Sequence, residues 1–499
     1  MSKAHSSVIL SIDQGTTSTR TLVFSPNGHM LFSAQEEFPQ IYPQDGWVEH
    51  DPHDIWNTTL STLKQAYNYA KENDFSIIGM GITNQRETTL IWDRHTGEPI
   101  YNAIVWQDRR TADQCRRIKS HYPEEQLTDK TGLLLDPYFS ATKAAWILDH
   151  VKGARGRAEQ GDLAFGTVDS FLIYKLTNGA AHATDMTNAS RTNFFNIHTR
   201  QWDDELLSLF DVPKSILPKV LDCAANFGTL DPDLLGEAIP IYGVAGDQQA
   251  AAIGQGCFGK GDIKSTYGTG CFVLVNTGET CLRSNNRLLS TIAYSFNGKT
   301  TYALEGSIFI AGAAIQWLRD SLKIIETAAE TETIARDMDS NHGVYLVPAF
   351  TGLGAPHWNP DARGIITGIT RDTNQHDIIR AALESVAYQT HDLITAIRED
   401  GIPPQKLKVD GGMVVNNWLM QFLSDILDIK ISRPVIMETT ALGAAYLCGL
   451  HAGLYENTDE IVNSWQLEKQ FIPGGDPKER ARHLENWQRA VSQAIVKTR

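Results

Sequence analysis

Residues 13–20 of the chain, DQGTTSTR, form a short polar segment between two apolar runs. A glycine there lets the backbone approach a ligand closely, and small hydroxyl residues add donors beside exposed backbone N–H groups, which suits phosphate oxygens. Asp13 cannot bind phosphate directly, because both are negatively charged, but it can hold a hydrated magnesium ion. Arg20 would place a positive charge beside the segment. The alternative is a threonine-rich hairpin with an ordinary turn aspartate.

Three later turns repeat this combination of glycine with aspartate or hydroxyl residues, at 246–249 (GDQQ), 267–270 (YGTG) and 410–412 (DGG). The YGTG turn lies between two β-rich runs, whereas the other two each join a strand-like run to a helix-like one. The repetition favours ligand-binding turns over the simpler hairpin hypothesis.

Strands and helices alternate around these turns, which is typical of an α/β protein. Residues 8–12 and 21–24 predict a β-hairpin around the first turn, and residues 54–71 have the three- and four-residue apolar spacing of a helix. Each half of the chain thus has a hairpin with a Gly/Thr turn and, later, a strand-to-helix turn bearing Asp beside Gly. This parallel predicts two related domains whose four turns surround one cleft.

The length of 499 residues fits two or three domains. We place the hinge at residues 254–261, which divides the chain into domains of residues 1–254 and 255–499. The hinge contains a Gly-x-Gly-x-x-Gly pattern, but it follows a helix-like run, and Gly261 stands where a phosphate-binding P-loop needs Ser or Thr after Lys260. We therefore interpret these glycines as a linker.

Near the C-terminus, one apolar stripe predicts a helix packed on the second domain: Leu484, Trp487, Val491 and Ile495.

Composition excludes several classes of protein. Hydrophobic residues make up 42% and charged residues 21%, as in ordinary globular proteins, and the net charge of -15 argues against nucleic acid or an anionic membrane as the main partner. The N-terminal segment lacks a long apolar stretch, so we expect no signal peptide, and no run is long enough to span a bilayer. Six scattered cysteines without metal or redox spacing predict reduced thiols in a cytoplasmic protein.

Several segments occur in the order found in the FGGY carbohydrate kinases, which the chain resembles from about Val8 to about Trp487. They are DQGTTSTR, GITNQRETT, AIVWQDRRT, DPYFSATK, GVAGDQQAA, TYGTGCF, VPAFTGLGAPHW and VDGGMVVNN. The first alone would indicate only the wider actin, heat-shock and hexokinase ATPase fold. The combination of NQRETT, DPYF and GDQQ resembles the members that phosphorylate glycerol.

The resemblance implies an α/β fold of two actin-like, ribonuclease-H-like ATPase domains with a cleft between them. The N-terminal domain would bind glycerol and phosphates, and the C-terminal domain would bind the nucleotide. It further implies ATP-dependent phosphorylation of glycerol to sn-glycerol 3-phosphate, with ATP/ADP and Mg²⁺ as cofactors, glycerol as the small-molecule partner, and a homo-oligomer, either dimer or tetramer.

Individual residues match the family's functional positions. Asp13 matches the magnesium-associated aspartate, and Asp247, which also contacts glycerol, is our candidate for the general base. The positions matching phosphate or nucleotide contacts are Thr16, Thr17, Ser18, Arg20, Thr269, Gly270, Gly312, Gln316, Gly412 and Asn416. The positions matching glycerol contacts are Arg86, Glu87, Trp106, Tyr138, Asp247, Gln248 and Phe272.

Five of the seven glycerol positions also have a plainer interpretation. Arg86 and Glu87 could be a surface ion pair worth little, Trp106 and Phe272 could be ordinary core residues, and Tyr138 could be a structural turn residue. For the whole chain, the runner-up functions are an FGGY kinase for xylulose, ribulose or gluconate, and a non-catalytic actin-like or chaperone-like ATPase.

The chain departs from the family in its regulatory region. Some members are inhibited by fructose bisphosphate at a glycine-rich loop carrying an arginine; the corresponding residues 228–241 here carry Asp231, Asp233 and Glu237 and no basic residue. Residues 217–241 also contain no histidine, which some members phosphorylate near this loop. Met413 replaces a smaller residue in the nucleotide motif, which puts nucleotide affinity or adenine preference in doubt.

Because an acidic loop repels a bisphosphate, we predict that fructose bisphosphate inhibits this protein weakly or not at all. Initial rates measured with increasing effector should stay unchanged, and clear inhibition at a sub-millimolar concentration would overturn the prediction.

Overall fold

The DQGTTSTR segment lies at the tip of an antiparallel hairpin in the computed structural model, which describes residues 7–359 and 361–495. Strand β1 (Ser7–Gln14) pairs with strand β2 (Ser18–Phe24), so both strands extend further into the turn than the sequence predicted. Residues 1–6, part of the segment used to predict the absence of a signal peptide, lie outside the described residues.

The hairpin belongs to a five-stranded sheet with the order β13-β5-β1-β2-β3. Its other strands are β3 (Met30–Glu37), β5 (Ser76–Asn84) and β13 (Ile241–Gly246). Strands β5 and β13 run parallel to β1. Both faces of β1 are covered, because Leu10 and Ile12 pack with helix α1 (Pro52–Glu72) while Ile9 packs with helix α15 (Thr439–His451).

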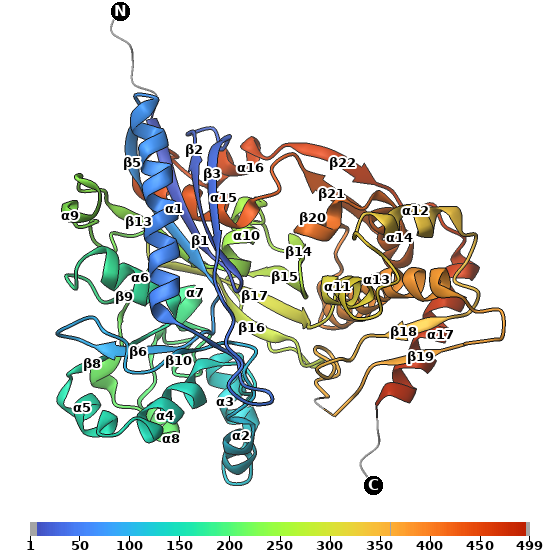
Figure 1. Ribbon diagram of the computed structural model, residues 1–499, viewed down its shortest axis with the longest axis horizontal. Helices are drawn as coiled ribbons and strands as arrows, with labels where there is room; N and C mark the ends of the chain where they lie inside the picture. Colours follow the sequence, from blue (N-terminus) through green and yellow to red (C-terminus); the bar gives the residue numbers. More distant parts are fainter. Residues whose placement is uncertain (1–6, 360, 496–499) are drawn as a thin grey trace, which may run out of the picture.

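A seven-stranded sheet with the order β16-β17-β15-β14-β20-β21-β22 forms the second lobe, to the right in Figure 1. It too contains a hairpin, β14 (Ile263–Tyr267) with β15 (Cys271–Gly278), and a parallel neighbour, β20 (Lys406–Asp410). The remaining strands are β16 (Leu289–Phe296), β17 (Lys299–Ile308), β21 (Lys430–Pro434) and β22 (Leu467–Phe471). The repeated hairpin predicted from the turns is confirmed.

The second half of the chain also forms helices that pack on this sheet or on one another. They are α11 (Gly312–Asp320), α12 (Glu330–Asp337), α13 (Gln375–Glu399), α14 (Asn417–Leu427), α16 (Thr458–Ser464) and α17 (Pro477–Ala494), with the small strands β18 (Tyr345–Val347) and β19 (Ile365–Thr367). The predicted C-terminal stripe is confirmed, since Trp487 and Val491 are buried in the core of this lobe and Leu484 and Ile495 pack against it.

The first lobe also contains many short elements, most of which lie below its sheet in Figure 1. These are β4 (Glu49–His50), β6 (Leu90–Asp93), β7 (Ala103–Ile104), α2 (Ala112–Lys119), α3 (Glu124–Thr131), α4 (Ser140–His150), α5 (Ala154–Gln160), β8 (Leu163–Gly166), α6 (Val168–Leu176), β9 (Ala183–Asp185), α7 (Met186–Ala189), β10 (Phe195–Asn196), β11 (Gln201–Trp202), α8 (Asp204–Phe210), η1 (Lys214–Ile216), β12 (Lys219–Leu221) and α9 (Pro232–Leu235). No helix in the described ranges combines the length and apolar character needed to cross a bilayer.

The later turns differ slightly from one another. Strand β13 leads directly into helix α10 (Asp247–Gly254), as predicted. After β20 the chain first makes a 3₁₀ turn, η2 (Gly412–Val415), and only then enters α14. Gly411 has a φ of 92° here, and a Cβ atom would lie 2.5 Å from the Tyr267 carbonyl oxygen, so the turn needs glycine. Gly254 ends α10 and packs against α15, so it is not a linker residue, whereas Gly256, Gly259 and Gly261 follow α10 and open no other helix.

Helices α10 and α15 join the two lobes through direct backbone contact. A Cβ atom on Gly443 would lie 1.8 Å from the Ala250 carbonyl oxygen, and one on Gly254 would lie 2.0 Å from the Thr439 carbonyl oxygen. Helix α15 also rests on the first sheet, where a Cβ on Gly81 would meet the Ala444 carbonyl oxygen at 2.2 Å. A helix from the second half of the chain thus completes the first lobe, and the predicted boundary at residue 254 stays a prediction.

We predict that Gly443→Ala destabilises the protein by about 3 kcal/mol or more, because the new methyl group must push α15 away from α10. Thermal unfolding measures the effect. The matched control is Gly156→Ala in helix α5, where a Cβ meets no atom within 4 Å; alanine there should be neutral or stabilising by up to about 1 kcal/mol. Equal stability of the two variants would contradict the close packing.

Candidate active site

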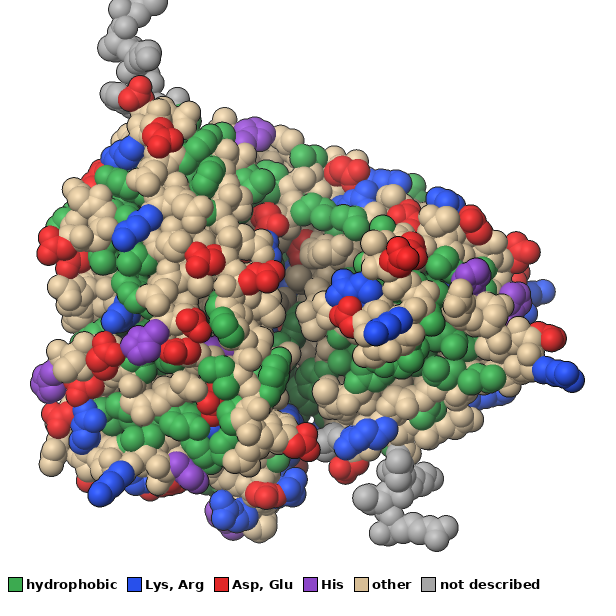
Figure 2. Space-filling model, viewed as in Figure 1, with side chains coloured by type: hydrophobic (Ala, Val, Ile, Leu, Met, Phe, Trp, Pro, Cys, Tyr) green, Lys and Arg blue, Asp and Glu red, His purple; other side chains and the backbone are tan. Residues whose placement is uncertain are grey.

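A cavity of about 450 Å³ opens between the lobes, in the hollow that Figure 2 shows along their boundary. It brings together all the residues predicted for glycerol, magnesium and phosphate contact. They are Asp13, Thr16, Thr17, Ser18, Arg20, Arg86, Glu87, Trp106, Tyr138, Asp247, Gln248, Thr269, Gly270 and Phe272. Three of the four predicted turns therefore meet in one cavity.

A second cavity of about 410 Å³ lies in the C-terminal lobe and contains the fourth turn. The predicted nucleotide residues Gly312, Gln316, Gly412 and Asn416 line it, as does Met413. Thr269 and Gln316 line both cavities, so the two adjoin at the YGTG turn. An elongated ligand could therefore place one end among the hydroxyl turns and the other among the residues of the second cavity.

Asp247 begins helix α10 and faces the first cavity. Its Oδ1 accepts a hydrogen bond from the Gln248 backbone N–H at 2.7 Å and lies 3.0 Å from Arg86 Nε. Burial raises the pKa of Asp247, and the Arg86 guanidinium opposes this rise while Glu87 adds to it. The helix N-terminus and the arginine both favour the ionised carboxylate, which can then accept a proton or hydrogen bond.

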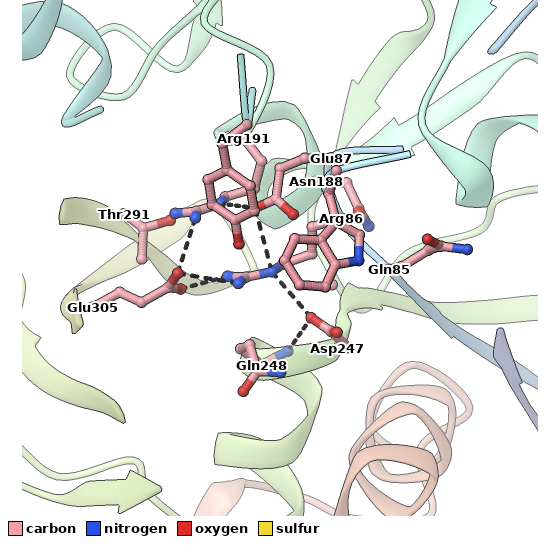
Figure 3. Close-up of polar contacts among 12 residues, drawn as sticks. Gln85, Arg86, Glu87, Asn188, Arg191, Asp247, Gln248, Thr291 and Glu305 are labelled. Carbon is pink, nitrogen blue, oxygen red and sulfur yellow. Dashed lines mark hydrogen bonds and ion pairs between the residues drawn. The ribbon is translucent and has the colours of Figure 1, made fainter. Parts of the chain in front are cut away.

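Arg86 and Glu87 belong to a buried ionic cluster, shown in Figure 3. Their side chains are only 2% and 3% exposed, so the surface ion pair considered from the sequence is wrong. The Arg86 Nη atoms donate to Glu305 at 2.5 and 3.1 Å. Arg191 donates to Glu87 Oε1 at 2.7 Å and to Glu305 Oε1 at 2.9 Å.

Sequence analysis missed Arg191 and Glu305. Glu305 lies within the apolar strand β17, in the segment YALEGSIF, and a single carboxylate in an otherwise buried strand is the signal that could have revealed it. Arg191 follows the short helix α7 and had no comparable signal.

Aromatic rings from both lobes form one wall of the first cavity. The Trp106 ring lies 5.7 Å from Tyr138 and 6.2 Å from Phe272, with edge-to-face geometry in both pairs. Trp106 and Phe272 are partly exposed to the cavity rather than enclosed in a core. Trp106 Nε1 also donates to Thr16 Oγ1 at 3.0 Å, which ties the aromatic wall to the first turn. Such a wall can contact C–H groups and limit ligand size.

The two turns predicted to contact phosphate, at residues 13–20 and 267–270, are each closed by a backbone hydrogen bond. Gly15 N–H donates to the Ser18 carbonyl at 3.0 Å, and Gly268 N–H donates to the Gly270 carbonyl at 2.9 Å. Arg20 does not point freely into the cavity, because its Nη1 lies 2.5 Å from Glu438 Oε2 at the start of α15. A phosphate that used Arg20 would therefore share or replace this partner.

Asp13 has the environment expected of a carboxylate that needs a cation. Its pKa is raised to about 6, mainly by burial; Arg20 opposes this rise, and Glu438 and Asp247 contribute to it. Within residues 7–359 and 361–495, no group of three or more His, Cys, Asp or Glu side chains is arranged to hold a metal ion.

Lys143 is buried next to the cavity residue Tyr138, and the sequence analysis did not identify it. Its buried Nζ donates to the Tyr138 carbonyl oxygen at 2.8 Å, which fixes the chain that carries this cavity residue. Burial lowers the pKa of Lys143 to about 7, and the nearby Glu87 carboxylate opposes the shift.

Since unfolding restores the ordinary pKa of 10.5, the unfolded chain binds more protons at Lys143 between pH 7 and 10.5 than the folded one does. The stability of the wild type relative to Lys143→Met should therefore rise by about 1 kcal/mol per pH unit in this window and stay constant below pH 7. Urea unfolding at pH 6, 7, 8 and 9 measures this difference. A difference that does not change with pH would mean that Lys143 stays protonated in the folded protein.

Comparison with known proteins places this site in a family. Residues 8–254 match the N-terminal domain, and residues 263–452 the C-terminal domain, of the FGGY family of carbohydrate kinases. The chain is 60% identical to a glycerol kinase of Rhodospirillum centenum, over 97% of each chain, and 57% identical to glycerol kinase 1 of Pseudomonas aeruginosa, over 97% and 98%.

Solved structures agree with the fold. The crystal structure of Plasmodium falciparum glycerol kinase with ADP superposes with a TM-score of 0.91 at 38% identity, covering 99% of both chains. Xylulose kinase from Lactobacillus acidophilus, at 22% identity and a TM-score of 0.87 over 98% and 97% of the chains, shares the same fold. The predicted α/β fold with two actin-like domains is confirmed, and this chain belongs to the FGGY family of carbohydrate kinases.

Proposed function

We propose that this protein transfers the γ-phosphoryl group of ATP to a terminal hydroxyl of glycerol, giving sn-glycerol 3-phosphate. The observation that carries the proposal is the convergence of Asp247, Arg86 and the two hydroxyl turns on one cavity, which adjoins a second cavity at Thr269. Relatives at 55–60% identity over nearly their whole length are named glycerol kinases, and a related glycerol kinase was crystallised with ADP.

The polar end of the cavity suits a small polyol. Arg86 supplies donors, Glu87 and Asp247 supply acceptors, and Trp106 with Phe272 faces the carbon skeleton. A substrate that lacks a hydroxyl leaves one of these buried groups unpaired, at a cost of about 1–3 kcal/mol. The aromatic wall restricts longer sugars by size, so the site favours glycerol over the xylulose, ribulose or gluconate alternatives.

Phosphoryl transfer depends mainly on positioning and charge stabilisation, because its transition state is loose. We assign Asp247 as the base that orients the attacking hydroxyl and accepts its proton as the bond to phosphorus forms. The Thr16–Ser18 and Thr269–Gly270 turns supply backbone and hydroxyl donors for the phosphate oxygens. The second cavity, with Gly312, Gln316, Gly412 and Asn416, would hold the rest of the nucleotide.

Magnesium fits the residues around Asp13. Asp13 would hold the ion through water or directly, and the bound cation would neutralise charge on the ATP phosphates. Closure of the lobes would exclude water from the reacting groups and limit wasteful hydrolysis of ATP.

Three further properties belong to the proposal. The six cysteines are free thiols, which supports the cytoplasmic location predicted from the sequence. The homo-oligomer implied by the resemblance is a prediction that light scattering can test. The division at residue 254 into a glycerol- and phosphate-binding domain and a nucleotide-binding domain is likewise proposed, with α15 crossing between the lobes.

The direct test is glycerol-dependent release of ADP, with the phosphorylated product identified by mass spectrometry. We expect glycerol to support turnover and xylulose, ribulose and gluconate to support far less. Preferred turnover of one of these sugars would favour another FGGY activity. ADP release that does not depend on any polyol and yields no phosphorylated product would favour the non-catalytic ATPase.

Asp247→Asn should lower kcat roughly a hundred- to ten-thousandfold, the contribution of a positioned general base, while nucleotide still binds. Steady-state kinetics and calorimetry with ADP measure the two properties. Asp392→Asn is a control for replacing a buried carboxylate: Asp392 accepts a hydrogen bond from Trp487 Nε1 at 2.8 Å in the C-terminal lobe, and this variant should keep its turnover. Turnover of Asp247→Asn near that of the wild type would remove Asp247 from this role.

A further inference from the structure

Glu305 connects the two lobes next to Arg86, which lines the first cavity. It lies in β17 of the C-terminal sheet and is fully buried, yet both of its carboxylate oxygens accept hydrogen bonds from arginines of the N-terminal lobe. Neither Glu305 nor Arg191 is among the described residues that line the cavity. Any effect of Glu305 on the substrate must therefore act through other side chains.

The first of these is Arg86, whose orientation Glu305 fixes. Arg86 Nη1 donates to Glu305 at 2.5 Å and to Gln249 Oε1 at 3.2 Å, and Nη2 donates to the other oxygen of Glu305 at 3.1 Å. This two-point contact sets the plane of the guanidinium. It turns Nε toward Asp247, which lies 3.0 Å away, as Figure 3 shows.

The second is Glu87, which Glu305 reaches through Arg191. Arg191 uses Nη2 for Glu305 and Nε for Glu87 Oε1, at 2.9 and 2.7 Å. The Arg191 guanidinium also lies 5.4 Å from the centre of the Phe139 ring, so packing restricts its other positions. The Glu305 carboxylate from the second lobe thus holds two neighbouring cavity residues: Arg86 by direct contact, and Glu87 through Arg191.

The charges show why a neutral replacement would matter. The cluster contains two guanidiniums and three carboxylates, those of Arg86, Arg191, Glu87, Asp247 and Glu305. All of these side chains are buried except that of Asp247, which is 33% exposed. Without the charge of Glu305, the repulsion between the two arginines is less compensated, and Arg86 keeps as partners only the carboxylates of Glu87, 3.7 Å from its Nε, and Asp247, 3.0 Å from it. Arg86 would then bind Asp247 more tightly and compete with the substrate hydroxyl.

We propose that Glu305 is a positioning residue for polyol recognition, which holds Arg86 and, through Arg191, Glu87 in place across the lobe boundary. This inference rests on the proposed function of the same cavity. It assigns to the nucleotide-side lobe a part in selecting the hydroxyl pattern of the substrate, although Glu305 itself does not contact it.

The test compares Glu305→Gln and Glu305→Asp with the wild type in full-length protein. Glutamine keeps the shape but loses the charge and turns an N–H group toward an arginine, so we expect the KM for glycerol to rise about ten- to a hundredfold while the KM for ATP changes less than about twofold. Aspartate keeps the charge and should recover part of the loss. Glu305→Asp also tests the proposal if Glu305→Gln does not fold.

A second measurement separates positioning from general destabilisation. The ratio of kcat/KM for glycerol to kcat/KM for propane-1,3-diol, which lacks the central hydroxyl, should fall in Glu305→Gln, because a displaced Arg86 and Glu87 no longer penalise the missing group. The matched control is Glu384→Gln, which neutralises another fully buried carboxylate paired with an arginine, Arg380 Nε at 2.8 Å, on helix α13 and away from the first cavity. This control should leave both the glycerol KM and the ratio unchanged.

The inference is overturned if Glu305→Gln, or Glu305→Asp where the former does not fold, keeps the wild-type glycerol KM and discrimination ratio. It is equally overturned if the variant changes the KM for glycerol and for ATP in parallel with the ratio unaltered, which is the result of a purely structural role. Wild-type protein that phosphorylates no glycerol would overturn the proposed function and this inference together. An active wild type with unaffected Glu305 variants would overturn the inference alone.

Discussion

Direct backbone contact between α10 and α15 is the constraint on which the rest of the molecule depends. Glycine at positions 254 and 443 lets the two helices approach until carbonyl oxygens occupy the space of a side chain. Each helix follows a strand of one sheet and contacts the other lobe, so their separation sets the separation of the sheets. The hairpin turns of both sheets face one cavity only because this distance is small.

That geometry explains why Asp247 combines structural and chemical roles. It starts α10, the helix that fixes the lobes, and its carboxylate emerges beside Arg86 at the floor of the cavity. A base placed on a rigid element keeps its position relative to both the hydroxyl turns and the polyol contacts. The helix N-terminus favours its ionised form in surroundings that otherwise raise its pKa.

The ionic cluster around Arg86 and Glu305 is unfavourable for stability but useful for binding a substrate. Removing several charges from water is unfavourable, and hydrophobic residues could fill the same volume with equal or greater stability. The cluster instead provides donors and acceptors with fixed directions, which a flexible or solvated arrangement would not. Its members come from both lobes, so the substrate site exists in full only when the lobes are assembled.

The sequence alone determined the α/β class, the two hairpins and the strand-to-helix turns, and it identified residues that line the two cavities, while their contacts with a ligand stay predictions. These features depend on local periodicity, on glycine beside aspartate or hydroxyl residues, and on motifs a few residues long, all of which can be recognised before folding. Asp13, Asp247 and the YGTG turn are examples: each stands where a strand ends, and the ends of neighbouring strands meet.

Tertiary structure decided what depends on pairing between distant residues. Glu305 meets Arg86 across 219 positions, and Arg20 pairs with Glu438 across 418. The position of α15 on the first sheet is of the same kind. No local pattern encodes such contacts, because they form when two independently patterned lobes dock and their buried charges must find partners.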